Sequence, residues 1–341
     1  MLLEAIEQAK EEILISTYAF NSDRVGKPFI AALCDAARRG VRVRVLFDYF
    51  GSRDDAQNIS EKLSAAGISV RAFRPISKWI LKHPLALMCR DHARVFLIDR
   101  TLFGLGGMGF ADIYRERSDI FMLHRVLSAA AVVSFFENLW QLDSRVSLSK
   151  PLRDASNPAL SFDYALLASG PLKRDQDIYR WLIEACSTAQ KHIRIITPFF
   201  FPDRRLLGEF ADALARGVQV TIITPIRTDK PRYDRFRAVA APQLASRGAT
   251  WYTTHYFFHA KIFTVDTHWA FGSANFDIIS TQRNYELSIC GTGGAILRQL
   301  QNIADGFMRD GVRMNAISTP LFIKILGSIF YRTTEFFFKL T

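Results

Sequence analysis

The stretches HARVFLID (92–99) and HAKIFTVD (259–266) share the pattern H-x-[K/R]-x4-D. Each lies within a run of apolar residues, and such a run predicts a buried β-strand. The two stretches stand about half a chain length apart in a sequence of 341 residues. A pattern that recurs at this distance in the same local context indicates that the chain consists of two similar halves.

The polar residues of the two stretches have defined places on these strands. Residues two apart on a strand project from the same face, so His92 lies beside Arg94, and His259 lies beside Lys261. Each half therefore presents an imidazole and a cation together on one face.

The aspartates that close the two stretches have a different expected role. Asp99 and Asp266 each follow their histidine by seven residues. This odd separation places them on the opposite face of a regular strand. We therefore expect both aspartates to fix the end of the strand and not to touch a substrate.

A second pair of acidic residues recurs with the histidines. Asp119 comes 27 residues after His92, and Glu286 comes 27 residues after His259, each in a strand-like run. A carboxylate that accepts a proton from one ring nitrogen sets the tautomer and the orientation of an imidazole. Both acids are therefore candidate partners of the histidines.

A turn of small residues follows each stretch. The first turn is Gly106-Gly107-Met108-Gly109, and the second is Gly272-Ser273-Ala274-Asn275. Small residues allow the backbone and a short polar side chain to approach an anion closely.

The sequence around the two stretches repeats one order of elements. Residues 5–48 and residues 182–224 both read helix, strand, helix and strand, and in both a glycine ends the second helix. This alternation predicts an α/β fold, with two α/β/α halves whose sheets are mixed, mostly parallel, and packed as a pseudo-dimer. The expected divisions are a first half at 1–150, a linker at 151–174, a second half at 175–315 and an amphipathic C-terminal tail at 316–341.

Composition and charge limit the class of protein. Apolar residues make up 49% and charged residues 23% of the chain, which excludes disordered, collagen-like and coiled-coil proteins. The net charge of +11 favours an anionic partner such as phosphate, nucleic acid or an acidic membrane surface. The four cysteines form no CxxC pair, so a reducing compartment is expected, without a zinc site or a disulfide framework. No apolar run predicts a signal peptide or a membrane-spanning helix.

The duplicated pattern and its two turns resemble the phospholipase D superfamily over nearly the whole chain. More narrowly, the sequence resembles the bacterial cardiolipin synthases. Four stretches carry this resemblance: VGKPFIAALCDAARRGVRVRVLFDYFGS (25–52), GGMGFADIY (106–114), TPFFFPDRRLLGEFADALARGVQVTIITP (197–225) and FGSANFDIISTQRNYELSI (271–289).

The resemblance implies a transfer between phosphodiesters that needs no metal and no other cofactor. In that family one histidine attacks phosphorus and forms a phosphohistidine, while the other protonates the leaving alcohol and then deprotonates the incoming one. Carried over by position, His92 is the nucleophile and His259 the general acid and base. The other residues carried over are the phosphate ligands Arg94, Lys261, Ser273 and Asn275, the histidine partners Asp119 and Glu286, and the motif aspartates Asp99 and Asp266.

The sequence departs from the family pattern at two positions. Arg94 stands where the family usually has lysine, and Gly109 stands where cardiolipin synthases typically have asparagine. Arginine keeps the charge, but its planar group is larger than an ammonium. The missing amide at position 109 is expected to weaken phosphate positioning on one side.

These inferences together predict a membrane-associated phosphatidyltransferase. It would move a phosphatidyl group onto phosphatidylglycerol, with phosphatidylglycerol or phosphatidylethanolamine as donor, at the anionic cytoplasmic face of a bacterial inner membrane. A phospholipase D-type hydrolase would use the same residues with water as acceptor. A nuclease would suit the charge but not the apolar C-terminus, so nucleic acid is not the expected partner. A non-catalytic lipid-binding protein would result if Arg94 and Gly109 had disabled turnover.

Overall fold

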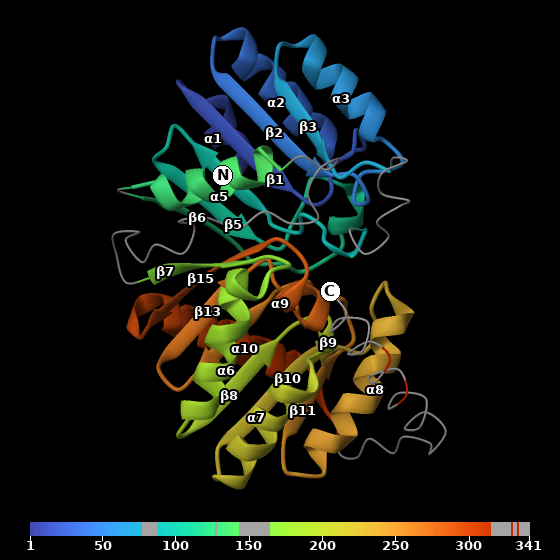
Figure 1. The fold of residues 1–341 in the computed structure, drawn as a ribbon, viewed down its shortest axis with the longest axis vertical. Helices are drawn as coiled ribbons and strands as arrows, with labels where there is room; N and C mark the ends of the chain where they lie inside the picture. Colours follow the sequence, from blue (N-terminus) through green and yellow to red (C-terminus); the bar gives the residue numbers. More distant parts are fainter. Residues whose placement is uncertain (77–86, 127, 143–163, 315–328, 330–332, 334–341) are drawn as a thin grey trace.

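A computed structural model of the protein describes residues 1–76, 87–126, 128–142, 164–314, 329 and 333. Figure 1 shows two halves stacked on each other, the first running from blue to green and the second from green to red. Apart from two isolated positions, the expected C-terminal tail at 316–341 lies outside the described residues, as does the first part of the expected linker.

The first half is built on a six-stranded sheet in the order β3-β2-β1-β4-β5-β6. Helices α1, α2 and α3 pack on one face of this sheet through an apolar cluster that includes Ile6, Leu33 and Leu63. The elements of this half are α1 (Leu2–Glu7), β1 (Glu12–Thr17), α2 (Gly26–Arg38), β2 (Arg42–Asp48), α3 (Ala56–Ala65), β3 (Ser69–Phe73), β4 (Val95–Ile98), β5 (Leu102–Gly106), the short 3₁₀ helix η2 (Asp112–Tyr114), β6 (Phe121–Arg125) and α5 (Ala130–Trp140).

The second half repeats this order of strands and adds one strand at each edge. Its eight-stranded sheet runs β16-β11-β10-β8-β12-β13-β15-β7, and β14 pairs with β9 in a separate two-stranded sheet. Its elements are β7 (Tyr164–Ser169), η3 (Lys173–Asp175), α6 (Asp177–Thr188), β8 (His192–Ile196), β9 (Phe200–Phe201), α7 (Arg204–Ala215), β10 (Gln219–Pro225), α8 (Pro231–Ala245), β11 (Thr250–Thr254), β12 (Ile262–Val265), β13 (His268–Gly272), β14 (Phe276–Asp277), α9 (Ile278–Gln282), β15 (Glu286–Thr292), α10 (Gly294–Asp310) and β16 (Val312–Arg313).

The two α/β halves are confirmed, but their sheets contain less parallel pairing than the sequence predicted. In the first half, β1 pairs with β2 and β2 with β3 in parallel, whereas β4 and β5 join the sheet antiparallel. The second half has the same arrangement. Parallel strands need a crossover connection, whereas a tight turn makes the next strand antiparallel. Strands β4 and β12 directly follow the H-x-[K/R] residues, and a tight turn after each of them makes β5 antiparallel to β4 and β13 antiparallel to β12.

The ends of the second helices follow the sequence prediction. Helix α2 ends at Arg38, and Gly40 follows with φ of 91°, while α7 ends at Ala215 and Gly217 follows with φ of 86°. Glycine adopts this left-handed conformation without steric cost. The two helices therefore end at equivalent points, and in each half the chain continues directly into the next strand.

The expected linker at 151–174 ends earlier than predicted. Residues Tyr164–Ser169 form β7, which pairs antiparallel with β15 along its whole length. Ser, Pro and Asp around this segment suggested a loop, but Tyr164, Leu166 and Ala168 alternate with less buried neighbours and face the core. The alternation of burial covers residues 164–168, because Ser169 is also fully buried. In the sequence these five residues form only a short apolar run, which does not by itself distinguish a strand from a helix.

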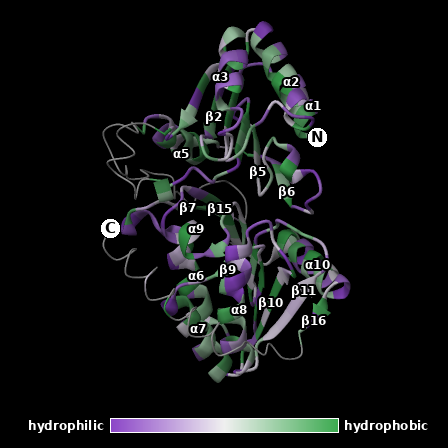
Figure 2. Ribbon diagram, turned by 90° about the vertical axis from the view of Figure 1, so that its right-hand side faces the viewer, coloured by the Kyte–Doolittle hydropathy of each residue, from purple (hydrophilic) through white to green (hydrophobic). Residues whose placement is uncertain are grey.

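One apolar cluster joins the two halves. It includes Leu97 and Phe135 from the first half, and Ile262, Leu287 and Leu300 from the second. The outer helices α2, α3, α6 and α7 show hydrophilic and hydrophobic residues alternating along their length (Figure 2), as expected for helices that cover a sheet with one face. Among the described residues, none of the helices combines the length and the apolar character that crossing a bilayer requires.

Asp99 and Asp266 hold the ends of the motif strands, as expected. The carboxylate of Asp99 accepts hydrogen bonds from the backbone N–H groups of Lys10, Glu11 and Glu12, at 2.8 to 3.2 Å. That of Asp266 accepts from the N–H groups of residues 190, 191 and 192. Both aspartates have positive φ, 49° and 52°. Each thus ties the turn after its strand to the beginning of the neighbouring strand.

Removing the charge of Asp99 or Asp266 should destabilise the fold. Partial burial raises the pKa of Asp99, but the three N–H donors outweigh it and lower the pKa below its ordinary value, and the same holds for Asp266. We predict that Asp99→Asn or Asp266→Asn, which keeps a residue tolerant of positive φ, lowers the free energy of unfolding by about 2 kcal/mol at pH 7. Urea unfolding measures this change.

The pH dependence identifies the cause of this loss. A carboxylate with a lowered folded-state pKa stabilises the fold above its unfolded pKa, and this contribution is lost as the pH falls through the folded-state pKa. The difference between variant and wild type should therefore shrink below about pH 4. Asp212→Asn, at an exposed position of α7, serves as control. A difference that stays constant down to pH 2 would rule out the charge as its origin.

Candidate active site

A cavity of about 650 Å³ lies where the two halves meet, and both motif histidines line it. The first half contributes the segment before β4 and the loop containing η2, while the second contributes the segment before β12 and the start of α8. The lining residues are Tyr18, Phe50, Arg53, Leu87, Met88, Arg90, His92, Arg94, Ile113, Tyr114, Arg117, Phe199, Asp229, Lys230, Arg232, Tyr233, His259, Asn275, Ile279, Ser280 and Asn284.

His92 is held by a residue of the second half. Its Nδ1 lies 2.7 Å from Oε1 of Glu286, which is fully buried. The backbone repeats this connection, because the N–H of His92 donates to the carbonyl of Tyr285 at 2.9 Å. Backbone and side chain therefore fix the imidazole against the strand that carries Glu286.

His259 is held in the same way by the first half. Its Nδ1 lies 3.0 Å from Oδ2 of Asp119, and its backbone N–H donates to the carbonyl of Ser118 at 2.7 Å. The sequence spacing identified both acids, but it counted each acid from the histidine of its own half. The structure instead pairs each histidine with the acid of the other half.

Burial and the neighbouring cations control the charge of the two histidines. Burial lowers the pKa of His92 well below its ordinary value, and Arg94 and Lys261 lower it further. Burial and the same two cations lower the pKa of His259, to which His92 itself adds. Both imidazoles are therefore neutral at pH 7, and they lie close enough to influence each other.

The acidic partners are shifted in the opposite direction. Burial raises the pKa of Asp119 to about 6, although Lys261 opposes this effect. Asp119 is thus ionised at pH 7 and can accept a hydrogen bond from Nδ1–H of His259, which leaves the lone pair of the neutral imidazole on Nε2. Burial also raises the pKa of Glu286 well above its ordinary value, although Arg94 and Ser273 oppose this.

The motif cations Arg94 and Lys261 are almost completely buried. Each reaches back to its own histidine, because the guanidinium of Arg94 donates to the carbonyl of His92, and the ammonium of Lys261 donates to the carbonyl of His259. Burial lowers the pKa of Lys261 well below its ordinary value, although Asp119 opposes it. The arginine thus takes the place that lysine has in the second half.

The two polar residues of the second turn occupy different places. Asn275 lines the cavity, and its Nδ2 donates to the hydroxyl of Ser280 at 3.3 Å. Ser273 is fully buried and is not among the lining residues. Its hydroxyl donates to Oε2 of Glu286 at 2.5 Å. Ser273 therefore supports the carboxylate behind His92, so its expected role as a phosphate ligand is not favoured by its position.

Gly109 lies against backbone and ring atoms that leave no room for a side chain. A Cβ atom at this position would lie 2.7 Å from the carbonyl oxygen of Ala19 and 2.9 Å from Cε2 of Tyr114. Contacts this short do not occur at real Cβ atoms. An asparagine, which cardiolipin synthases typically have at this position, would therefore displace both neighbours. The ring of Tyr114 fills the space beside the cavity.

Sequence reasoning did not single out Tyr114 and Arg117. The hydroxyl of Tyr114 accepts a hydrogen bond from Arg94 at 3.2 Å, and its ring stands edge-on to His259 at 5.7 Å between centroids. Arg117 lies between the rings of Tyr114 and Phe257, 5.1 and 4.9 Å from their centroids. Tyr114 ends the quoted stretch GGMGFADIY, but only the 3₁₀ turn η2 brings it back to the cavity.

The segment before His92 is fixed by a buried ion pair. Asp48, at the end of β2, binds the guanidinium of Arg90 at 2.9 Å and also accepts the backbone N–H of Asp91. Breaking a buried pair by removing one partner is costly, because the other charge remains uncompensated. This pair therefore holds the chain rigidly two residues before the histidine.

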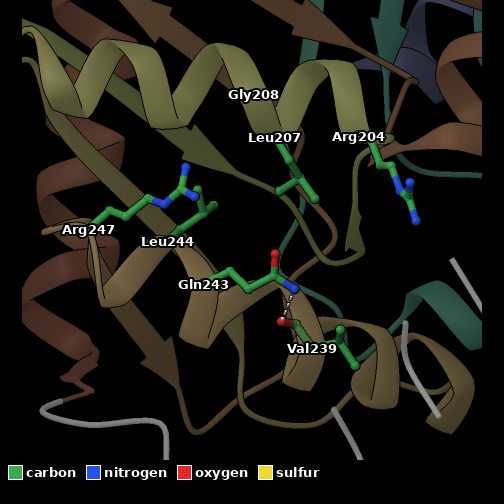
Figure 3. Close-up of a pocket in the computed structure, with 7 residues that line it drawn as sticks. All are labelled: Arg204, Leu207, Gly208, Val239, Gln243, Leu244 and Arg247. Carbon is green, nitrogen blue, oxygen red and sulfur yellow. Dashed lines mark hydrogen bonds between the residues drawn. The ribbon is translucent and has the colours of Figure 1, made fainter. Parts of the chain in front are cut away.

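Two further observations delimit the site. In the described part of the chain, His, Cys, Asp and Glu form no group of three or more with an arrangement that could hold a metal ion. A smaller hollow of about 370 Å³ lies between α7 and α8 and includes none of the residues expected in the site (Figure 3). It is lined by Arg204, Leu207, Gly208, Val239, Gln243, Leu244 and Arg247.

The duplicated fold and the paired motifs at its boundary define a phospholipase D-like protein. The family model described as "Cardiolipin synthase, PLD-like domain" matches residues 2–140 and 182–308. The chain belongs to this family.

Individual proteins agree with this assignment. Cardiolipin synthase 1 of Bacillus anthracis is 31% identical over 307 residues, which cover 84% of this chain and 59% of that protein. A cardiolipin synthase of Oceanobacillus iheyensis is 29% identical over 323 residues, covering 92% of this chain and 67% of that protein. The chain thus spans about three fifths of the length of the first of these relatives.

A solved structure shares the fold. The phosphatidylserine synthase of Haemophilus influenzae Rd KW20 superposes with a TM-score of 0.72 and 14% sequence identity, covering 99% of this chain and 91% of that chain. At this identity the likeness establishes the architecture of two stacked halves.

Restoring the asparagine of the family pattern should harm this protein. We predict that Gly109→Asn lowers the free energy of unfolding by about 1–3 kcal/mol, because the new side chain collides with the carbonyl of Ala19 and with the ring of Tyr114. Urea unfolding measures the loss. Gly208→Asn is the matched control, since a Cβ at Gly208 meets no atom within 4 Å. Equal stability of both variants would contradict the close packing at Gly109.

Proposed function

We propose that this protein is a phosphatidyltransferase that forms cardiolipin by moving a phosphatidyl group from one phospholipid to the headgroup hydroxyl of phosphatidylglycerol. The observation that carries the proposal is the histidine pair. Two neutral imidazoles from opposite halves line one cavity, and a buried carboxylate holds the Nδ1 of each. This arrangement suits a reaction in two steps with a nucleophile and a separate proton carrier.

In the first step, Nε2 of His92 attacks the phosphorus atom of the donor lipid. The bond from phosphorus to the headgroup oxygen breaks, and His259 donates a proton to the leaving alcohol. The negative phosphodiester beside His259 counters the cations that lower its pKa, so that the imidazolium form becomes available. The phosphatidyl group is then carried on His92.

In the second step, His259 takes the proton from the incoming hydroxyl of phosphatidylglycerol. The alkoxide oxygen attacks phosphorus, the bond to Nε2 of His92 breaks, and His92 returns to its neutral form. Arg94, which lines the cavity, would bind the non-bridging phosphoryl oxygens in both steps. Lys261 is buried and is not among the lining residues, so it would contribute its positive charge from beside His259. Glu286 and Asp119 would act as positioning residues, because each holds the Nδ1 of one histidine.

The rim of the cavity supports a lipid substrate and binding at an anionic membrane surface. Ile113 lines the cavity and is 48% exposed, and Leu87 and Met88 line the same opening. These apolar side chains would contact acyl chains while the headgroup enters the cavity. The net charge of +11 would add attraction to anionic lipids, at about 1 kcal/mol per well-placed basic residue. We expect the protein at the cytoplasmic face of a bacterial inner membrane.

The proposal is tested by lipid mass spectrometry after incubation of the purified protein with phosphatidylglycerol vesicles, with and without phosphatidylethanolamine. We predict that cardiolipin accumulates with the wild type and that His92→Ala and His259→Ala reduce its formation at least about 10³-fold. His268→Ala, at an exposed position at the start of β13, should leave the rate unchanged.

Other outcomes would replace the proposal. Phosphatidic acid in place of cardiolipin would identify a hydrolase, with water as the acceptor. Cleavage of single-stranded DNA with unchanged lipids would identify a nuclease. Tight lipid binding without any product, and without a phosphohistidine on His92, would identify a non-catalytic lipid-binding protein.

A further inference from the structure

The cavity holds more positive charge than one phosphodiester requires. Besides Arg94, its lining includes Arg53, Arg90, Arg117, Lys230 and Arg232, against a single acidic residue, Asp229. Two of these cations are already matched by carboxylates, because Arg90 is paired with Asp48 and Arg117 is paired with Asp229 at 2.8 Å. The unmatched charge therefore lies on the remaining three.

The cations at the start of α8 are available for a ligand. Within the described residues, neither Lys230 nor Arg232 forms an ion pair, and both are exposed at the cavity mouth. Arg232 packs its guanidinium 5.4 Å from the ring centroid of Tyr233. Arg53 comes from the first half, and in the described part of the chain its one ion-pair partner is Asp54, at 3.4 Å, whose carboxylate is 91% exposed. Such an exposed pair contributes little.

Aromatic contacts place Lys230 and Arg232 on the His259 side of the cavity. The ring of Tyr233, on which Arg232 packs, lies 4.6 Å from the ring of Phe199, and Phe199 lies 6.4 Å from His259. A second series of contacts runs from His259 through Tyr114 to Arg117. Arg117 in turn binds Asp229, the residue before Lys230. Both routes lead from the proton carrier to the same two cations.

This placement matters because, in the proposed function, the hydroxyl of the acceptor lipid must reach His259. Phosphatidylglycerol carries its reactive hydroxyl at one end of the glycerol headgroup and its own phosphodiester at the other. With the hydroxyl at His259, the phosphodiester lies further toward the mouth on the same side. It carries a negative charge that the histidine site, already occupied by the donor phosphate, does not balance.

We infer that Lys230 and Arg232 form a second phosphate subsite, which binds the phosphodiester of the acceptor phospholipid. The inference rests on the proposed function. It assigns the selection of the acceptor lipid to Lys230 and Arg232. The subsite selects an anionic lipid alcohol over a neutral alcohol or water, because only the anionic acceptor gains the second contact.

The subsite is tested by comparing two acceptors with one donor. Vesicles of phosphatidylglycerol are supplied with ¹³C-labelled glycerol, so that transfer to a second lipid gives cardiolipin, and transfer to glycerol gives labelled phosphatidylglycerol. The double variant Lys230→Gln/Arg232→Gln should lower cardiolipin formation roughly tenfold at subsaturating lipid, through a higher KM. Labelled glycerol carries no phosphate, so its incorporation should fall much less.

The matched control removes the same charge from the same region. Arg227→Gln/Arg235→Gln changes two exposed arginines that are not among the cavity-lining residues, and it should leave the ratio of the two products at the wild-type value. Attraction of the protein to the vesicle as a whole would instead be lowered to the same extent by both double variants.

Three results would overturn the inference. Equal loss of both products in Lys230→Gln/Arg232→Gln would assign the cations to the donor lipid or to the membrane surface. An unchanged product ratio would show that they bind no acceptor phosphate. The same change of ratio in the control variant would show an effect of net charge alone. Failure of the proposed function is distinct, since the wild type would then form no cardiolipin, whatever it transfers to water or to labelled glycerol.

Discussion

The exchange of hydrogen bonds between the halves is the constraint on which the site depends. The chain at His92 pairs with the chain at Tyr285, and the chain at His259 pairs with the chain at Ser118. Each pairing brings an imidazole of one half onto a carboxylate of the other. Neither half alone therefore contains a histidine with its partner. Both halves are therefore needed to complete each histidine–acid pair.

Burying so many ionisable groups has an energetic cost that the surrounding fold must offset. Arg94, Lys261 and Glu286 are almost completely buried beside the two histidines, and burial opposes the charged form of each. The apolar cluster that joins the halves offsets this cost, because burying its side chains stabilises the fold through the hydrophobic effect. In the proposed function, the low local dielectric would strengthen the interaction of these charges with a phosphodiester. The pKa values of both histidines are lowered, and in the proposed reaction a negative substrate would favour the uptake of a proton by His259.

Much of this arrangement could be predicted from the sequence, because it depends on residue spacings within short segments. The motif residues, the strand ends at Asp99 and Asp266 and the glycines that stop the helices all follow from spacing. The pairing of His92 with Glu286 and of His259 with Asp119 could not be predicted, because spacing within one half carries no information about contacts with the other half. The sequence also could not predict that a side chain at position 109 would collide with its neighbours, because the collision depends on the carbonyl of Ala19 and the ring of Tyr114. The strand β7 was missed because loop-forming residues surround a short apolar run.

The central claim is the crossed pairing of histidines and acids, and ¹⁵N NMR of the histidine rings tests it most directly. Glu286→Gln should change the Nδ1 resonance of His92 and leave that of His259 nearly unchanged, whereas Asp119→Asn should do the reverse. The reason is that each substitution replaces the acid that contacts one ring nitrogen only, at 2.7 and 3.0 Å respectively. If Glu286→Gln changed His259 and Asp119→Asn changed His92, each acid would serve its own half, and the account would be contradicted.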